Sequence, residues 1–167
     1  YNDALENKYQ WCIAAVPGKA WARKVFPGLS DDEAVEKLWE AILYTSRVDD
    51  DPVAAWEKHN KKLAERCAFL NSHKFEYLEY KSSNGTDFKV GLIDKGIFAG
   101  GGETTLGKGI YFNPNIPSEE VFSSPMRGRA EGRVVATKPL SYQGKLIENF
   151  WLEFRDGKVV KTHAEKN

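Results

Sequence analysis

The sequence has no charge imbalance and no long apolar run. Its 167 residues contain 24 basic and 24 acidic side chains, so the formal net charge is zero. A nucleic-acid-binding domain usually carries a basic excess, which is missing here. No apolar stretch approaches the roughly 20 residues that a membrane-spanning helix needs, and no basic amphipathic stretch of the kind found on membrane-surface proteins is present. We therefore expect neither a nucleic-acid partner nor a membrane partner.

Cysteine is scarce, and no secretory leader is visible. Cys12 and Cys67 are the only two cysteines, and each lies among apolar residues outside any CxxC pair. We expect buried, reduced thiols and a cytoplasmic location rather than a disulfide or a redox role. The chain also begins at Tyr1 without an initiator methionine. Since the second segment already reads as an interior strand, we expect an excerpt of a longer protein.

Several familiar catalytic motifs are absent. The sequence contains no HExxH and no GxSxG, so the commonest zinc-protease and serine-hydrolase signatures are missing. Gly100, Gly101 and Gly102 are not followed by the spacing of a phosphate-binding loop; they favour a turn or a close backbone approach. His59, His73 and His163 have no ligand partner two or four residues away. We expect these histidines on the surface or at helix ends.

The first half of the chain predicts helices after one strand. The apolar run at residues 11–16 stops at Pro17 and is typical of a buried strand in a parallel sheet. Ser30 with Glu33 three residues on forms a capping box that opens a helix ending near Ser46. Asp51 as N-cap and Pro52 at the first helical position open a second helix, which runs to about Asn71. Its expected inward face consists of Val53, Trp56, Asn60, Leu63 and Cys67.

The second half predicts short strands joined by hairpins. Asn84-Gly85 and Asp156-Gly157 are turn signals between runs that read as strands. We expect an α/β fold with a mixed sheet, packed helices in the first half, and an antiparallel, hairpin-rich second half. Residues 1–167 are expected to form a single domain excerpt, with a helix-rich part at 1–72 and a strand-rich part at 73–167.

Two adjacent carboxylates are the candidate functional residues. Pro114 and Pro117 keep the segment before Glu119 and Glu120 extended. Adjacent side chains of an extended segment point to opposite sides, so one glutamate is expected to face solvent or a cation and the other to face inward. An inward glutamate on a rigid segment suits a metal ligand or a general base. The alternative is an acidic loop without a function, and the pattern alone leaves both open.

The run from Asn115 to Pro125 resembles a known family signature. It matches the order asparagine, apolar residue, proline, Thr/Ser, any residue, Glu, Val, Phe, Thr/Ser, any residue, proline. This is the signature of the aminopeptidase T and aminopeptidase S family, the thermophilic-type metallo-aminopeptidases. Further blocks resemble the family in the same order: Ala20-Trp21-Ala22 with Val25-Phe26-Pro27, Leu38-Trp39 with Asp51-Pro52, Trp56 and His59, then Leu70-Asn71, and Lys138-Pro139-Leu140.

The resemblance implies a metal-dependent hydrolase that removes N-terminal residues from peptides. It implies two divalent ions (zinc, cobalt or magnesium) held by two glutamates, two histidines and an aspartate. Such ions activate a shared water and polarise the scissile carbonyl. The first of those glutamates falls on Glu120, with Glu119 as the alternative. A peptide substrate and a homodimer of the full-length protein are further implications.

The remaining ligands of the family and its general base are expected beyond Asn167. One carboxylate cannot hold a pair of metal ions. We therefore expect this chain alone neither to bind the metals tightly nor to hydrolyse peptides. The competing hypothesis is a non-catalytic mixed α/β module for binding or dimerisation, which the 13% aromatic content would suit.

Overall fold

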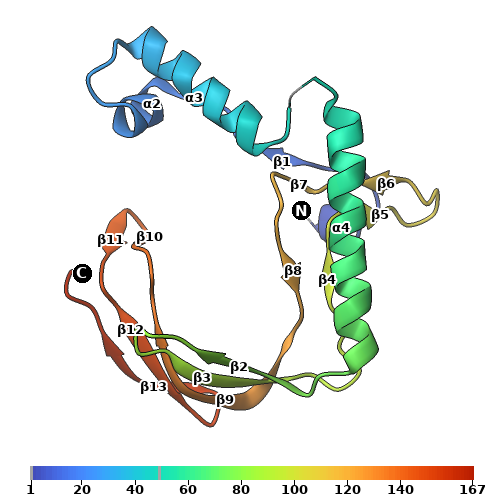
Figure 1. Cartoon of the computed structure of the whole chain (residues 1–167), viewed down its shortest axis with the longest axis vertical. Helices are drawn as coiled ribbons and strands as arrows, with labels where there is room; N and C mark the ends of the chain where they lie inside the picture. The colour runs from blue at the N-terminus through green and yellow to red at the C-terminus, as the bar shows by residue number, and fades with distance from the viewer. Residues whose placement is uncertain (1, 49) are drawn as a thin grey trace. The chain divides into compact units, whose positions relative to one another are not determined.

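A computed structural model describes residues 2–48 and 50–167 (Figure 1). The chain divides into two compact units. One comprises Tyr1–Ala68 and Ala99–Val121, and the other comprises Phe69–Phe98 and Phe122–Asn167. Helices and short strand pairs make up the first unit, and an antiparallel sheet dominates the second. The predicted fold class, helices first and antiparallel hairpins later, is confirmed.

The first unit has its core between two helices. Its helices are α1 (Asn2–Leu5), α2 (Lys19–Val25), α3 (Asp31–Thr45) and the part of α4 (Pro52–His73) up to Ala68. Helices α2 and α3 pack on each other through a buried cluster of Ala22, Ala34, Leu38 and Ile42. The apolar stripe of α3 recurs at helical spacing, so one face of the helix is removed from water.

The predicted helix starts are confirmed in detail. Ser30 Oγ accepts a hydrogen bond from the Glu33 backbone N–H, and a Glu33 carboxylate oxygen accepts one from the Ser30 N–H at 3.1 Å. Helix α3 ends at its C-cap, Ser46. At the start of α4, Asp51 Oδ1 accepts a hydrogen bond from the Ala54 N–H at 3.0 Å. Both helices therefore begin where side chains satisfy the first backbone donors.

The inward face of α4 differs from the predicted one. Val53 is exposed, whereas His59 and Leu63 are the buried residues of this helix. The expectation of a surface or capping His59 was wrong. Trp56, His59 and Leu63 follow the i, i+3, i+7 spacing of one helical face, so the histidine lies on the stripe that the tryptophan begins.

Three pairs of two-residue strands complete the first unit. Strand β1 (Ile13–Ala14) pairs in parallel with β7 (Asn115–Ile116), and β5 (Glu103–Thr104) pairs with β6 (Tyr111–Phe112) in antiparallel orientation. Strand β4 (Ala99–Gly100) pairs with β8 (Val121–Phe122).

The parallel pairing predicted for residues 11–16 is present, but the predicted burial is not. Ile13 and Val16 are exposed, and so is Cys12, which we expected to be buried. Among the described residues β1 has only the two-residue β7 as a neighbour in its sheet. Burial of a strand needs layers on both faces, and this pair alone supplies none.

The second unit is built on one five-stranded sheet in the order β13-β12-β9-β3-β2. All its neighbouring pairs are antiparallel. The strands are β2 (Tyr77–Lys81), β3 (Asp87–Leu92), β9 (Pro125–Val135), β12 (Trp151–Arg155) and β13 (Lys158–His163).

Two of its hairpins lie where the turn signals predicted them. Gly85 and Gly157 adopt φ of 95° and 71°, conformations that favour glycine. A third hairpin, β10 (Leu140–Tyr142) with β11 (Lys145–Ile147), was not predicted. Its turn at Gln143-Gly144 is a weaker signal than Asn-Gly or Asp-Gly. In residues 2–48 and 50–167, no helix is both long and apolar enough to cross a membrane.

Candidate functional site

The two candidate glutamates lie on a short connection in the first unit. Strand β7 ends at Ile116 and β8 begins at Val121, and the residues between them carry Glu119 and Glu120. The Ile116–Pro117 peptide bond is cis. Since β7 pairs with β1 and β8 pairs with β4, both ends of the connection are tied to neighbouring strands.

Glu119 has a cationic partner. Its carboxylate forms an ion pair with Arg47, the residue after the C-cap of α3. The other carboxylate oxygen lies 3.9 Å from His59 Nε2. Glu119 is therefore the member of the pair that faces a positive neighbour, as was expected of one of the two glutamates.

Glu120 has no such partner. Its carboxylate makes no hydrogen bond or ion pair with any residue in the described ranges, and the residue is exposed. One of the two glutamates was expected to face inward, but both are exposed. A hydrated carboxylate carries no desolvation cost, so Glu120 needs no cation to be stable in this chain. It remains available as an oxygen ligand.

His59 holds the backbone of this connection. Its ring lies on the buried face of α4, and Nε2 is 2.6 Å from the Ser118 carbonyl oxygen. A carbonyl oxygen only accepts, so Nε2 carries the hydrogen and donates. The sequence carried a signal for this role in the helical spacing of Trp56 and His59.

The glycine-rich loop approaches the same segment. A Cβ built on Gly100 would lie 2.5 Å from the Glu120 carbonyl oxygen and 3.2 Å from Val121 Cα. Any side chain at position 100 would therefore displace the backbone of the candidate ligand. Close backbone approach, one of the two roles expected for these glycines, is what Gly100 provides.

A second neighbour of the connection comes from α4 one residue after His59. Asn60 and Asn113 exchange two side-chain hydrogen bonds, at 3.0 Å and 2.9 Å. Asn113 lies two residues before Asn115, where the family-like signature begins. The α4 helix therefore contacts the chain around this signature at two points, through Asn60 at Asn113 and through His59 at Ser118.

The described residues do not suffice for a metal site. Within residues 2–48 and 50–167, no group of three or more His, Cys, Asp or Glu side chains could hold a metal ion. His73 stacks on Phe75 and His163 stacks on Trp151, and both histidines are exposed as expected. A protein metal site needs several ligands for each ion. Glu120 can supply one of them, and the other described residues do not complete the set.

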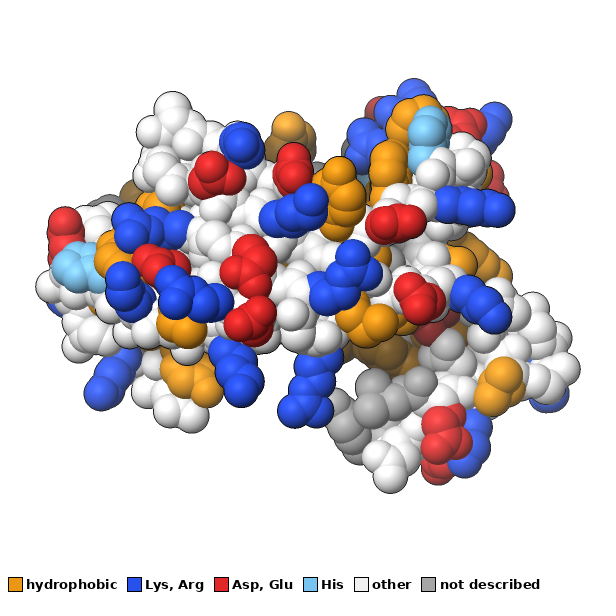
Figure 2. All heavy atoms as spheres, turned by 90° about the horizontal axis from the view of Figure 1, so that it is seen from below, with side chains coloured by type: hydrophobic (Ala, Val, Ile, Leu, Met, Phe, Trp, Pro, Cys, Tyr) orange, Lys and Arg blue, Asp and Glu red, His pale blue; other side chains and the backbone are white. Residues whose placement is uncertain are grey.

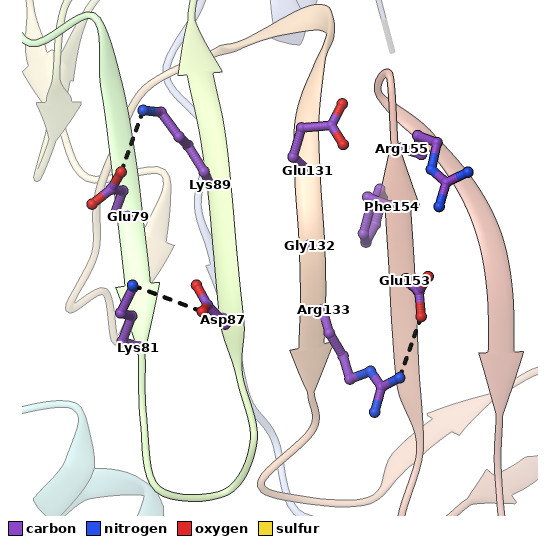
Figure 3. A pocket seen from close by; sticks show the side chains of 10 residues that line it. All are labelled: Glu79, Lys81, Asp87, Lys89, Glu131, Gly132, Arg133, Glu153, Phe154 and Arg155. Atoms are coloured by element: carbon purple, nitrogen blue, oxygen red, sulfur yellow. Dashed lines mark hydrogen bonds and ion pairs between the residues drawn. The ribbon is translucent and has the colours of Figure 1, made fainter.

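The second unit carries a charged recess of about 550 Å³ on its sheet (Figure 3). Ion pairs cross between neighbouring strands, with Lys89 on Glu79 at 3.3 Å and Lys81 on Asp87 at 3.7 Å. The Arg133 guanidinium, hydrogen-bonded to Glu153, holds the pKa of that carboxyl below its ordinary value. Figure 2 likewise shows basic and acidic side chains interspersed over the face in view. Because acidic and basic side chains alternate in the recess and several of them form ion pairs, the recess is a solvated face of the sheet without an excess of either charge.

Comparison with known proteins defines the class of the chain. The family model described as thermophilic metalloprotease (M29) matches residues 1–167. The chain belongs to this family, as the signature around Glu120 had indicated.

Individual relatives agree with the family. The chain is 46% identical to "Aminopeptidase 2" of Geobacillus stearothermophilus, over 97% of this chain and 39% of that protein. It is 46% identical to "Aminopeptidase T" of Thermus thermophilus, over 99% of this chain and 41% of the relative. The solved structure of wild-type AmpT from Thermus thermophilus superposes with a TM-score of 0.88 at 42% identity, covering 99% of this chain and 40% of that one. The chain thus spans about 40% of the length of the relatives it matches.

Proposed function

We propose that this chain forms part of a metal-dependent aminopeptidase that hydrolyses N-terminal residues from peptides. Membership of the thermophilic metalloprotease family supports the reaction class. The names of the relatives, all called aminopeptidases, support the peptide substrate. The cofactors proposed for the intact enzyme are two divalent ions, zinc, cobalt or magnesium.

Glu120 is the proposed metal ligand. The observation that carries this assignment is the contrast between the two adjacent glutamates. Glu119 is engaged by Arg47, whereas the Glu120 carboxylate is exposed and has no protein partner among the described residues. A carboxylate oxygen is a common ligand of zinc and magnesium. Glu119 as the ligand would have to share its carboxylate between the metal ion and Arg47.

To the proposed catalytic site the chain contributes one metal ligand, Glu120, and the residues that hold it. The other ligands and the general base are proposed to lie in the part of the family length that this chain does not span. With one candidate ligand, the chain alone is expected to bind divalent metal weakly and to be inactive. Homodimerisation and a cytoplasmic location of the intact protein are further proposals, which size-exclusion chromatography with light scattering and cell fractionation would test.

The decisive experiment measures hydrolysis of leucine-4-nitroanilide in the presence of added Zn²⁺ or Co²⁺. The intact polypeptide that carries this sequence is expected to release 4-nitroaniline, and residues 1–167 alone are expected not to. Loss of activity in the intact Glu120→Gln variant, with its fold unchanged by circular dichroism, would support the ligand role. Turnover by residues 1–167 alone would contradict the proposal that the other metal ligands and the general base lie outside these residues.

A second candidate function is a non-catalytic binding or dimerisation module. One observation favours it: an open apolar recess of about 800 Å³ lies at the end of α3, where Leu43, Tyr44 and Val48 are exposed. Tyr44 is 84% exposed. If the intact polypeptide had no peptidase activity with any of the three metals and still self-associated, this function would replace the first.

A further inference from the structure

We infer that His59 and Arg47 are positioning residues for Glu120. They hold the peptide segment 118–120 at its backbone and at the Glu119 side chain, and thereby fix the direction in which the Glu120 carboxylate points. The inference rests on the proposed role of Glu120 as a metal ligand. Both act through the segment that carries the proposed ligand: His59 through the Ser118 carbonyl oxygen and Arg47 through the Glu119 carboxylate.

His59 fixes the backbone of the segment. The residue is 7% exposed and sits on α4, a helix of 22 residues. Its Nε2–H donates to the Ser118 carbonyl oxygen at 2.6 Å, two residues before Glu120. The Trp56 ring packs edge-on against the imidazole with centroids 5.5 Å apart. A buried ring held on both sides is a rigid donor, so the Ser118 peptide group has little freedom to turn.

Arg47 fixes the side chains of the segment. It pairs with Glu119 and lies over the Trp56 ring, with the guanidinium carbon 5.8 Å from the ring centroid. Trp56 Nε1–H donates to the Ser46 carbonyl oxygen at 2.8 Å, which anchors the residue directly before Arg47. The backbone before Arg47 is therefore held in place. The Arg47 side chain itself is only 28% exposed.

The two contacts act on Glu120 through the chain geometry. Adjacent side chains in an extended segment point to different sides. When Arg47 holds Glu119 on one side, Glu120 is directed to the other. Gly100 supports this arrangement, since a side chain at position 100 would collide with the Glu120 carbonyl oxygen. Partners that orient a metal ligand in this way commonly change metal affinity by 10–100-fold when they are removed.

The test uses the intact polypeptide that carries this sequence, with Co²⁺ as the metal. Arg47→Met and His59→Leu remove the two contacts, whereas Arg47→Lys and His59→Gln keep a charge or a donor at similar reach. Lys37→Met is the matched control, because it removes an exposed ion pair with Glu40 on α3, the helix that ends just before Arg47, and Lys37 has no contact with residues 118–120 among the ion pairs described. The measurements are the Co²⁺ dissociation constant, the visible Co²⁺ absorption spectrum and the Tm of the metal-free protein.

Arg47→Met and His59→Leu are expected to raise the Co²⁺ dissociation constant by roughly 10-fold or more and to change the visible spectrum. His59→Gln and Arg47→Lys are expected to recover most of the affinity, and Lys37→Met to match the unsubstituted protein. A merely structural role would lower the Tm and leave the spectrum of the folded protein unchanged.

The ligand role of Glu120 and the positioning roles of Arg47 and His59 can be disproved independently. If Arg47→Met and His59→Leu keep the original affinity and spectrum while Glu120→Gln loses Co²⁺, the positioning inference is wrong and the ligand role stands. If Glu120→Gln itself binds Co²⁺ as before, both are wrong. Should His59→Leu fail to fold, the partly exposed Arg47→Met decides the outcome alone.

Discussion

Glu119 and Glu120 are neighbours in sequence with different surroundings. Arg47 reaches the first, and no described residue reaches the carboxylate of the second. The difference comes from one arginine at the end of α3 and one histidine on α4, both far from the glutamates in sequence. At the scale of single residues, the role of a carboxylate is therefore set by partners that lie elsewhere in the chain.

The two cysteines give a prediction at the same scale. Cys12 is exposed, whereas Cys67 is partly buried and burial raises the pKa of its thiol. The thiolate is the reactive form, so a raised pKa leaves less of it at neutral pH. Cys12 of the folded chain is expected to react first with 5,5′-dithiobis(2-nitrobenzoate) at pH 7. Single substitutions to serine assign the two phases, and a faster Cys67 would contradict the described surroundings.

Among the elements, β4 and β8 meet at Gly100. Gly100→Ala is expected to lower the free energy of unfolding by about 1–3 kcal/mol, because the added methyl group collides with the Glu120 backbone. Gly18→Ala is the control, since a Cβ there meets no atom within 4 Å. Urea unfolding followed by circular dichroism measures both. Equal losses for the two variants would show that the close approach at Gly100 is absent.

The start of α3 gives a second prediction for an element. Ser30→Ala removes the side chain that caps the helix and is expected to lower the free energy of unfolding by about 1 kcal/mol at pH 7. Ser46→Ala at the other end of α3 is a suitable comparison, since Ser46 contributes its backbone N–H rather than its side chain as C-cap. Thermal unfolding measures both, and an unchanged Tm in Ser30→Ala would contradict the capping box.

The same capping box makes a pH-dependent contribution. Hydrogen bonds from the Ser30 side chain and then from its backbone lower the pKa of Glu33 from its ordinary value of 4.5. A lowered pKa in the folded state means that the folded chain binds fewer protons there than the unfolded chain. The stabilisation is therefore present above pH 4.5 and is lost as the pH falls through the lower folded pKa. The Tm difference between the unsubstituted chain and Glu33→Ala is expected to be larger at pH 7 than at pH 3; the reverse order would contradict it.

At the scale of the whole molecule, local signals predicted more than long-range ones. Ser30 with Glu33 and the Asp156-Gly157 turn were read correctly, because each depends on residues close in sequence. The fold class and the family followed from the order of such segments and from the signature around Glu120.

Burial was harder to predict from the sequence. Ile13 and Cys12 were expected inside and are exposed, because a strand is buried only by the layers that cover it. His59 was expected outside and is buried, since polar residues on a helical stripe resemble surface residues when read alone. Arg47 was not singled out at all; its partner is 72 residues away, and no local pattern links them.

The division of the chain into two units matters for the proposed site. Every residue that holds the candidate ligand, including Arg47, His59 and Gly100, belongs to the same unit as Glu120. The orientation of the ligand is therefore set within one compact unit. The remaining ligands are proposed to come from the part of the family length outside this chain.

The central claim is that Glu120, and not Glu119, is a metal ligand. The most direct measurement is the Zn²⁺ dissociation constant of the intact polypeptide, compared between Glu120→Gln and Glu119→Gln. Loss of a ligand is expected to weaken Zn²⁺ binding by more than about 100-fold in Glu120→Gln, beyond the effect of removing an orienting partner. Glu119→Gln keeps an oxygen for Arg47 and is expected to lose about 10-fold at most. A larger loss in Glu119→Gln than in Glu120→Gln, or no loss in either, would contradict the assignment.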